Sequence, residues 1–124
     1  MEGNGPETVT EQLVDFFAVG DIDGVMSLYE PDAVFVEIEG VSRGLDEIRA
    51  AHERFAESGL TLTLKESATF EMGDLALVHW TWAVRDEEGA TMEGASAEVL
   101  RRQADGSWKF VIDNSDGATM VGLV

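Results

Sequence analysis

The chain has 124 residues, which is enough for one domain with a buried core. It contains no cysteine, which excludes disulfides, thiolate metal sites and cysteine nucleophiles. The net charge of −17 argues against nucleic acid and anionic membrane surfaces as partners, because both bind a basic protein face. No apolar stretch approaches the length of a membrane span, so we expect a cytoplasmic protein. The charge fits either simple solubility or adaptation to high salt, where repulsion between carboxylates is screened.

Two amphipathic helices are predicted near the N-terminus. Residues 1–7 are Gly-rich and acidic, so we expect them to be flexible and the domain to span residues 8–124. Thr8 and Glu11 have the spacing of a capping box at the start of the first helix. Asp21 is a suitable N-cap for the second helix, and Pro31 is expected to end it. The apolar residues at helical spacing are Val9, Leu13, Phe16 and Phe17, then Ile22, Val25, Met26 and Tyr29.

One more helix and a series of strands follow. A strand over residues 33–39 is closed by Gly40, and a helix is predicted over residues 45–58. Long strands are predicted from residue 60, over 75–85, over 91–102 and over 108–113, with a short one over 119–124. Glu66 lies among apolar residues that share one strand face, namely Leu60, Leu62, Leu64, Ala68 and Phe70. It either points into a cavity or reaches water at a bulge.

Helices come first and strands afterwards, an order that predicts an α+β fold. We expect a cone: a curved antiparallel or mixed sheet wrapped over about three N-terminal helices, with a pocket between the layers. Several strands carry apolar residues on both faces, as Leu77 and Trp80 show. One face packs on the helices, and the other is expected to be covered by a second subunit in a homodimer.

The chain resembles the nuclear-transport-factor-2-like superfamily, especially its SnoaL-like and ketosteroid-isomerase-like branch, over nearly its whole length. The residues that carry the resemblance are Phe16-Phe17 before residues 20–24, Leu28-Tyr29 before Pro31-Asp32-Ala33-Val34, residues 44–48, and Leu100-Arg101-Arg102 before residues 105–109 and Asp113. The resemblance specifies a fold more closely than a function, because this fold carries isomerases, polyketide cyclases, dehydratases, epoxide hydrolases and association domains.

The resemblance also suggests positions for catalytic groups. Counting from Asp32-Ala33, Glu37 takes the place of the isomerase's aspartate base. The alternative is an exposed strand carboxylate in a very acidic protein. Leu13 takes the place of the tyrosine that donates to the developing enolate, and leucine cannot donate. Glu98 is the nearest counterpart of the isomerase's protonated aspartate. Steroid isomerisation itself is therefore not implied, and a related proton-transfer chemistry remains open.

Other residues are candidates for a ligand pocket, and each has a purely structural alternative. The candidate ligand-binding residues are Phe17, Tyr29, Glu66, Trp80, Trp82, Glu98 and Asp113. The aromatic ones fill cores as often as they bind ligands, and Asp113 could belong to a turn. His79 could act as an acid or base if its strand face lines the pocket, but it is interpreted as a packing or interface residue. His52 is interpreted as a structural or surface residue. Their spacing does not suit a metal site, so neither a metal nor a cofactor is expected.

Two functions follow from these residues. The first is a cofactor-independent isomerase- or cyclase-like enzyme, in which Glu37 moves a proton on a small, mostly apolar, carbonyl-bearing molecule. The second is a non-catalytic module of the same fold that binds a small ligand or associates with a partner. Leu13, in place of the tyrosine donor, is the feature that favours the second.

Overall fold

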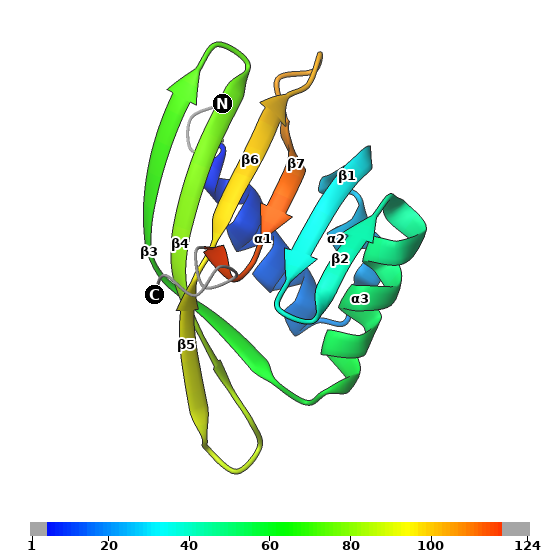
Figure 1. The fold of residues 1–124 in the computed structure, drawn as a ribbon, viewed down its shortest axis with the longest axis vertical. Coiled ribbons are helices and arrows are strands. Elements are labelled where there is room, and N and C mark those ends of the chain that lie inside the picture. Colours follow the sequence, from blue (N-terminus) through cyan, green and yellow to red (C-terminus); the bar gives the residue numbers. More distant parts are fainter. Residues whose placement is uncertain (1–4, 118–124) are drawn as a thin grey trace.

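The computed structural model describes residues 5–117, which form one curved sheet with helices packed behind it in the view of Figure 1. The helices are α1 (Glu7–Ala18), α2 (Ile22–Met26) and α3 (Leu45–Glu57). The strands are β1 (Tyr29–Glu37), β2 (Gly40–Arg43), β3 (Thr61–Met72), β4 (Leu75–Arg85), β5 (Thr91–Ala95), β6 (Ala97–Arg102) and β7 (Trp108–Asn114). Most of the segment predicted to be flexible (residues 1–4) and the strand predicted over residues 119–124 lie outside the described residues.

The sheet has the order β2-β1-β7-β6-β4-β3, and β5 pairs with β4 off this path. The neighbours β1 and β7 run parallel, whereas the other pairs are antiparallel. The result is a mixed, curved and unclosed sheet, which confirms the predicted α+β class and the wrapping of the sheet around the helices (Figure 1).

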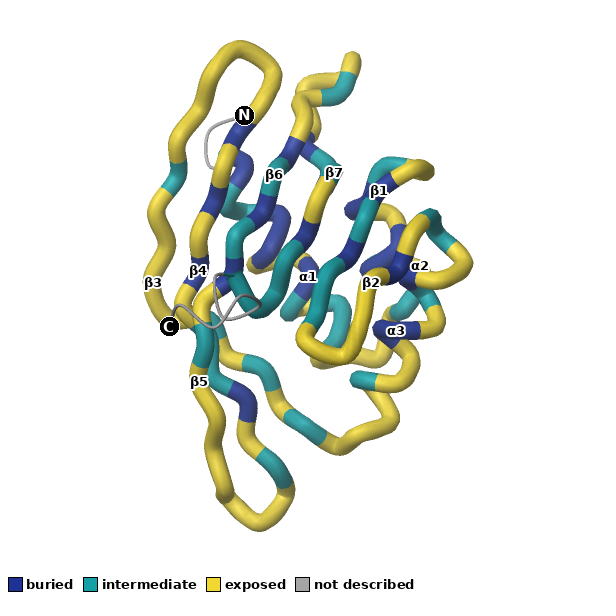
Figure 2. The backbone as a smooth tube through the Cα atoms, in the orientation of Figure 1, coloured by how far each residue is buried: buried dark blue, intermediate teal, exposed yellow. Residues whose placement is uncertain are grey.

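The core lies between the inner face of the sheet and the helices. Its completely buried residues include Val25 of α2, Ile48 of α3, Val78 of β4, Leu100 of β6 and Phe110 of β7. Figure 2 shows that the buried positions lie along the central strands and on the helices, whereas β3 and the tip of β5 are largely exposed. Within residues 5–117, no helix is both long enough and apolar enough to span a membrane.

The start of α2 matches the sequence prediction, whereas the start of α1 does not. Asp21 caps α2 as predicted, because its Oδ1 accepts a hydrogen bond from the Gly24 amide at 2.8 Å. The capping box at Thr8 is wrong, because α1 begins earlier, after Pro6, and has no side-chain cap. Thr8 already lies in the first turn, and its hydroxyl donates to the Gly5 carbonyl at 2.6 Å.

The first strand is longer than predicted. Pro31 does not end a helix, since α2 stops at Met26 and Pro31 lies inside β1. The parallel pairing with β7 is irregular between Tyr29 and Val34, and this irregularity accommodates a residue that has no amide hydrogen to donate. Gly40 does not close the strand region but begins β2, which pairs with β1 in a hairpin that the sequence analysis missed.

A bulge in β3 changes the face on which its residues lie. The register with β4 shifts between Leu64 and Ser67, so that alternation restarts after the bulge. Leu62 and Leu64 face the helices, whereas Phe70 lies on the outer face and is 61% exposed. The prediction of one continuous apolar face from Leu60 to Phe70 is therefore wrong. Glu66 lies at the bulge and is exposed, as in the alternative that placed it in water.

The strand predicted over residues 91–102 is divided into β5 and β6 at Ser96. The Ser96 amide donates to the Trp80 carbonyl at 2.8 Å, and the Ser96 hydroxyl accepts from the Trp80 amide at 3.2 Å. These two hydrogen bonds keep Ser96, the residue between β5 and β6, next to β4. Beyond it, β5 follows the lower part of β4 away from the rest of the sheet (Figure 1).

Candidate functional site

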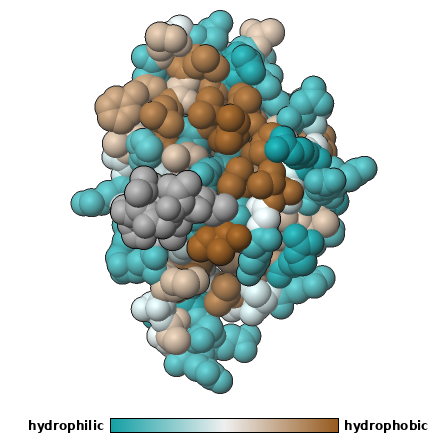
Figure 3. All heavy atoms as spheres, in the orientation of Figure 1, coloured by the Kyte–Doolittle hydropathy of each residue, from teal (hydrophilic) through white to brown (hydrophobic). Residues whose placement is uncertain are grey.

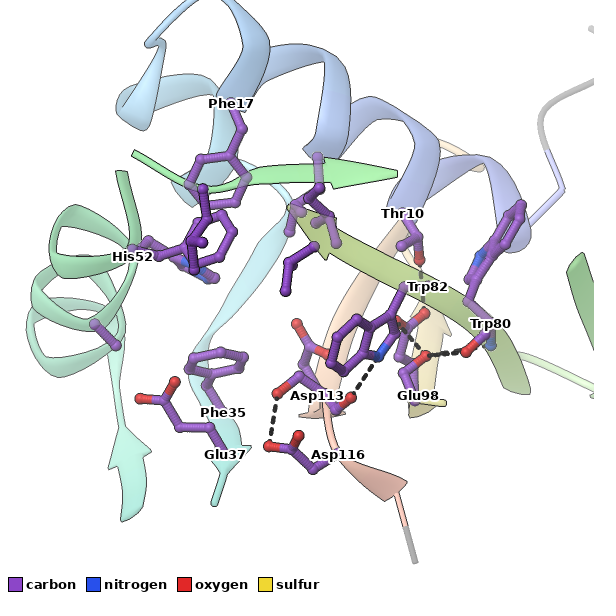
Figure 4. Close-up of a pocket in the computed structure, with 18 of the residues that line it drawn as sticks. Thr10, Phe17, Phe35, Glu37, His52, Trp80, Trp82, Glu98, Asp113 and Asp116 are labelled. Atoms are coloured by element: carbon purple, nitrogen blue, oxygen red, sulfur yellow. Dashed lines mark hydrogen bonds between the residues drawn. The ribbon is translucent and has the colours of Figure 1, made fainter. Parts of the chain in front are cut away.

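A cavity of about 340 Å³ lies between the inner face of the sheet and the helices α1 and α3. Its wall is mostly apolar, with Leu13 and Phe17 from α1, Phe55 from α3, and Leu62 and Leu64 from β3. Carboxylates interrupt this apolar wall at one side, where β1, β6 and β7 contribute acidic residues (Figure 4). A small apolar pocket with a few convergent polar groups is the usual form of a ligand site.

Glu98 and Asp113 form a buried carboxyl pair in this wall. They lie directly opposite each other in the β6–β7 ladder, and their residues are only 3% and 5% exposed. Glu98 accepts hydrogen bonds from the hydroxyls of Thr10, at 2.6 Å, and Ser96, at 3.1 Å. Burial, followed by repulsion from Asp113, raises the pKa of Glu98 to about 8. Glu98 therefore retains its proton at neutral pH.

Asp113 is held by a different set of partners. The Tyr29 hydroxyl donates to Asp113 Oδ2 at 2.5 Å and lies 2.8 Å from His52 Nε2. Burial raises the pKa of Asp113 to about 6, and the bond from Tyr29 opposes this rise by stabilising the carboxylate. Burial also lowers the pKa of His52 to about 4, so its imidazole is neutral. As the pH rises, Asp113 is therefore the first carboxyl of the pair to lose its proton, and Glu98 is the second.

Glu37 occupies a more open part of the cavity, at the end of β1. Its side chain is 26% exposed, and Arg54 of α3 lies 4.0 Å from Oε1. Burial, followed by repulsion from Glu39, raises the pKa of Glu37 above its ordinary value, and Arg54 acts in the opposite direction. This carboxyl combines access to the cavity with an environment that favours proton uptake.

Two tryptophans from β4, Trp80 and Trp82, form another part of the cavity wall. Trp82 Nε1 donates to the Ser115 carbonyl at 2.8 Å, which orients its ring across the cavity (Figure 4). Gly94 lies against this ring, because a Cβ at residue 94 would lie 2.4 Å from it. Trp80 is 6% exposed, and its Nε1 is the only fully buried side-chain polar atom without a partner in the described part of the chain.

The structure brings most of the sequence-predicted site residues together. The cavity wall includes Glu37, Phe17, Trp80, Trp82, Glu98 and Asp113. Tyr29 is 2% exposed and does not line the cavity, but it contacts two residues that do. Glu66 lies away from it, beside a separate shallow depression that also includes Lys65 and Thr81.

Sequence reasoning did not place His52, Thr10 and Ser96 in the site. Thr10 and Ser96 bond to Glu98, and His52 contacts Tyr29, which in turn bonds to Asp113. A signal existed for His52, since it lies on the apolar side of the third predicted helix together with Ile48 and Phe55. No group of three or more metal-ligating side chains is found among residues 5–117.

Comparison with solved structures places the fold in a known class. An NTF2-like protein of unknown function from Pseudomonas putida KT2440 is 20% identical, with a TM-score of 0.78 over 89% of this chain and 82% of that one. An NTF2-like protein with a cystatin-like fold from Novosphingobium aromaticivorans is also 20% identical, with a TM-score of 0.74 over 94% and 84%. A provisionally assigned ketosteroid isomerase from Shewanella frigidimarina NCIMB 400 is 25% identical, with a TM-score of 0.74 over 86% and 90%.

The fold is thus that of the NTF2-like proteins. The family model of the SnoaL-like domain matches residues 10–111, and the chain belongs to the SnoaL-like family. No curated protein matches the chain. The resemblance identified in the sequence is confirmed, and it leaves the activity to be inferred from the site.

Proposed function

We propose that this chain is a cofactor-independent isomerase- or cyclase-like enzyme that moves a proton on a small, mostly apolar, carbonyl-bearing molecule. The observation that carries the proposal is the buried pair of Glu98 and Asp113 in an otherwise apolar cavity. A carboxyl that stays neutral at pH 7 donates a hydrogen bond to a carbonyl oxygen and stabilises negative charge that develops there.

Glu37 is the proposed base. Its raised pKa brings a carboxylate closer to the range in which it exchanges protons efficiently near neutral pH. Glu98 lies deeper in the same wall, so a ligand that spans the cavity meets a base at one end and a neutral donor at the other. In the abstraction of a proton next to a carbonyl, the base takes the proton and the donor stabilises the negative charge that develops on the carbonyl oxygen.

The second candidate function is that of a non-catalytic ligand-binding or association module. Leu13 favours it, because this residue lines the cavity where the isomerase resemblance implies a tyrosine donor. Without that tyrosine, only Glu98 is left among the donors that the resemblance implies. A module would use the same apolar wall to hold a ligand without chemical change.

A homodimer is part of the proposal. Apolar residues from five neighbouring strands form one row on the outer face of the sheet, here called the outer row: Phe70, Leu77, Val99, Ile112 and Val34. Leu77 is 39% exposed and Ile112 is 42% exposed, and Figure 3 shows apolar side chains gathered over the strands on this face. An exposed apolar patch of this kind is typical of an interaction site, and a second copy of the chain is the proposed partner.

Exchange of hydrogen for deuterium tests the proton-transfer step without knowledge of the product. A panel of small apolar ketones and diketones is incubated with the protein in D₂O, and loss of the α-proton signal is followed by NMR. In Glu37→Gln the exchange rate should fall on the order of 10²–10⁴-fold. Glu53→Gln, which removes an exposed carboxylate from α3, should leave the rate unchanged.

The melting temperature of both variants should match that of the parent, which separates lost chemistry from lost folding. A Glu37→Gln rate within a few-fold of the parent would exclude Glu37 as the base. Ketones that raise the melting temperature without any exchange would instead support the binding module.

A further inference from the structure

Three buried side chains connect two points of the cavity wall. His52 comes from α3, Tyr29 from the start of β1 and Asp113 from the end of β7, and each is at most 5% exposed. His52 and Asp113 line the cavity, whereas Tyr29 lies behind it and bridges them through its hydroxyl. Phe17 and Phe35 pack against the His52 ring, with centroids at 5.3 and 4.7 Å, and keep its orientation fixed.

The proton positions along this chain follow from its geometry. A phenol hydroxyl has one proton, and that of Tyr29 is donated to Asp113. His52 Nε2 must therefore be the donor in its 2.8 Å contact with the Tyr29 oxygen, which leaves the lone pair of neutral His52 on Nδ1. Nδ1 has no hydrogen-bond partner among the described residues and is not one of the fully buried unpartnered atoms, so it retains some access to its surroundings. His52 is also one of the residues that line the cavity.

We propose that His52, Tyr29 and Asp113 form a proton relay, in which His52 accepts a hydroxyl or enol proton from the ligand and Asp113 stores the added charge. His52 Nδ1 takes the ligand proton, Nε2 passes its own proton to the Tyr29 oxygen, and the Tyr29 proton moves to Asp113 Oδ2. Afterwards His52 carries its proton on Nδ1, Tyr29 is again a neutral phenol and Asp113 is a neutral acid. The ligand holds the negative charge that Asp113 has lost, so no atom or charge is unaccounted for.

The relay rests on the proposed function and narrows its substrate class. The ligand needs an O–H group beside His52 in addition to its carbonyl, as in a hydroxyketone or the enol form of a diketone. An apolar ketone without such a hydroxyl would use only Glu37 and Glu98.

The energetics favour a relay over simple protonation of His52. An imidazolium enclosed by Phe17, Phe35 and Tyr29 is poorly solvated, in agreement with the lowered pKa of His52. The relay never forms this cation, because each proton that arrives at Nδ1 releases another from Nε2. The acidic groups that act on these three residues are Glu37 of β1, which makes proton uptake by Asp113 easier, and Glu98 of β6, which together with Glu37 raises the pKa of the Tyr29 phenol.

Nitrogen NMR of the histidine rings tests the relay in the unliganded protein. The chain has two histidines, and a His79→Gln variant assigns the signals of His52. At pH 8 we expect the Nε2–H tautomer. As Asp113 takes up a proton near pH 6, its new O–H should donate to Tyr29, Tyr29 should donate to Nε2, and His52 should change to the neutral Nδ1–H tautomer.

A Tyr29→Phe variant keeps the buried ring and removes the bridging oxygen. In this variant the His52 tautomer should no longer change when Asp113 titrates. The relay would be overturned if His52 of the parent kept one tautomer from pH 8 to pH 5, or if it became an imidazolium in step with Asp113. Because the measurement needs no substrate, its failure is distinct from a failure of the proposed enzyme activity.

Discussion

Replacement of Glu98 by glutamine is expected to stabilise the fold at neutral pH. Glutamine has nearly the same shape as protonated glutamate, and the Thr10 and Ser96 hydroxyls can either donate to it or accept from it. It differs in having no proton to lose. The substitution therefore removes the cost of keeping a titratable group in an apolar wall and leaves the surrounding packing intact.

The size of the effect follows from the pKa of Glu98. Its value is raised from 4.5 to about 8 in the folded protein, so between these values the unfolded chain is ionised while the folded one holds its proton. Stability is therefore lost progressively as the pH rises from about 4.5 towards 8. At about 1.4 kcal/mol per pKa unit, the loss at pH 7 is about 3 kcal/mol. Below pH 4.5 both states are protonated and the loss disappears.

Urea unfolding of the parent, Glu98→Gln and Glu53→Gln at pH 4 and pH 7 measures this difference. The exposed Glu53 supplies the control, because its replacement makes the same glutamate-to-glutamine change at a position outside the cavity. Glu98→Gln should exceed the control by about 3 kcal/mol at pH 7 and should equal it at pH 4. If Glu98→Gln is no more stable than the control at pH 7, Glu98 is ionised in the fold and is not the neutral donor.

Two further predictions concern assembly and salt. Light scattering at micromolar concentration should give twice the chain mass, and Ile112→Lys in the outer row should give a monomer, whereas Val19→Lys, at an exposed position beside α1, should remain dimeric. A parent that is monomeric would refute the outer row as an interface. If repulsion within the net charge of −17 opposes folding, the melting temperature should rise clearly between about 0.01 M and about 1 M sodium chloride, as the screening length falls from about 30 Å to about 3 Å. A melting temperature that stays flat would assign the charge to solubility alone.

Local rules predicted the elements whose ends depend on neighbouring residues. The N-cap at Asp21 and the strand from Leu75 to Arg85 match the sequence prediction, because a side-chain cap and a period of two are properties of a short segment. The bulge in β3 is different, since it depends on which β4 residue pairs with each side of it. No period within residues 60–72 indicates that Phe70 turns outward after Glu66, and this change moves Phe70 from the predicted apolar face to the outer row.

The pairing of the two buried carboxyls likewise could not be predicted from local sequence. Glu98 and Asp113 were both candidates, yet only the β6–β7 register places them opposite each other. That register includes an irregularity between Val99 and Leu100, which spacing in the sequence does not indicate. His52 was interpreted as a structural or surface residue of the third predicted helix. Its contact with Tyr29 depends on how α3 packs on β1, which is a tertiary property.

Thr10 provides a hydroxyl group near Leu13, the position at which the resemblance implies a tyrosine donor. Thr10 lies three residues before Leu13, so both project from one face of α1, and both line the cavity. The Thr10 hydroxyl donates to Glu98, and this bond opposes the rise in the pKa of that carboxyl. Helix α1 thus still supplies a hydroxyl to the site, but this hydroxyl bonds to Glu98, so in the proposed reaction it would influence the ligand only through that carboxyl. An isomerase-like reaction in this chain would consequently depend on the protonation of one carboxyl, where the tyrosine implied by the resemblance would supply a second, independent donor.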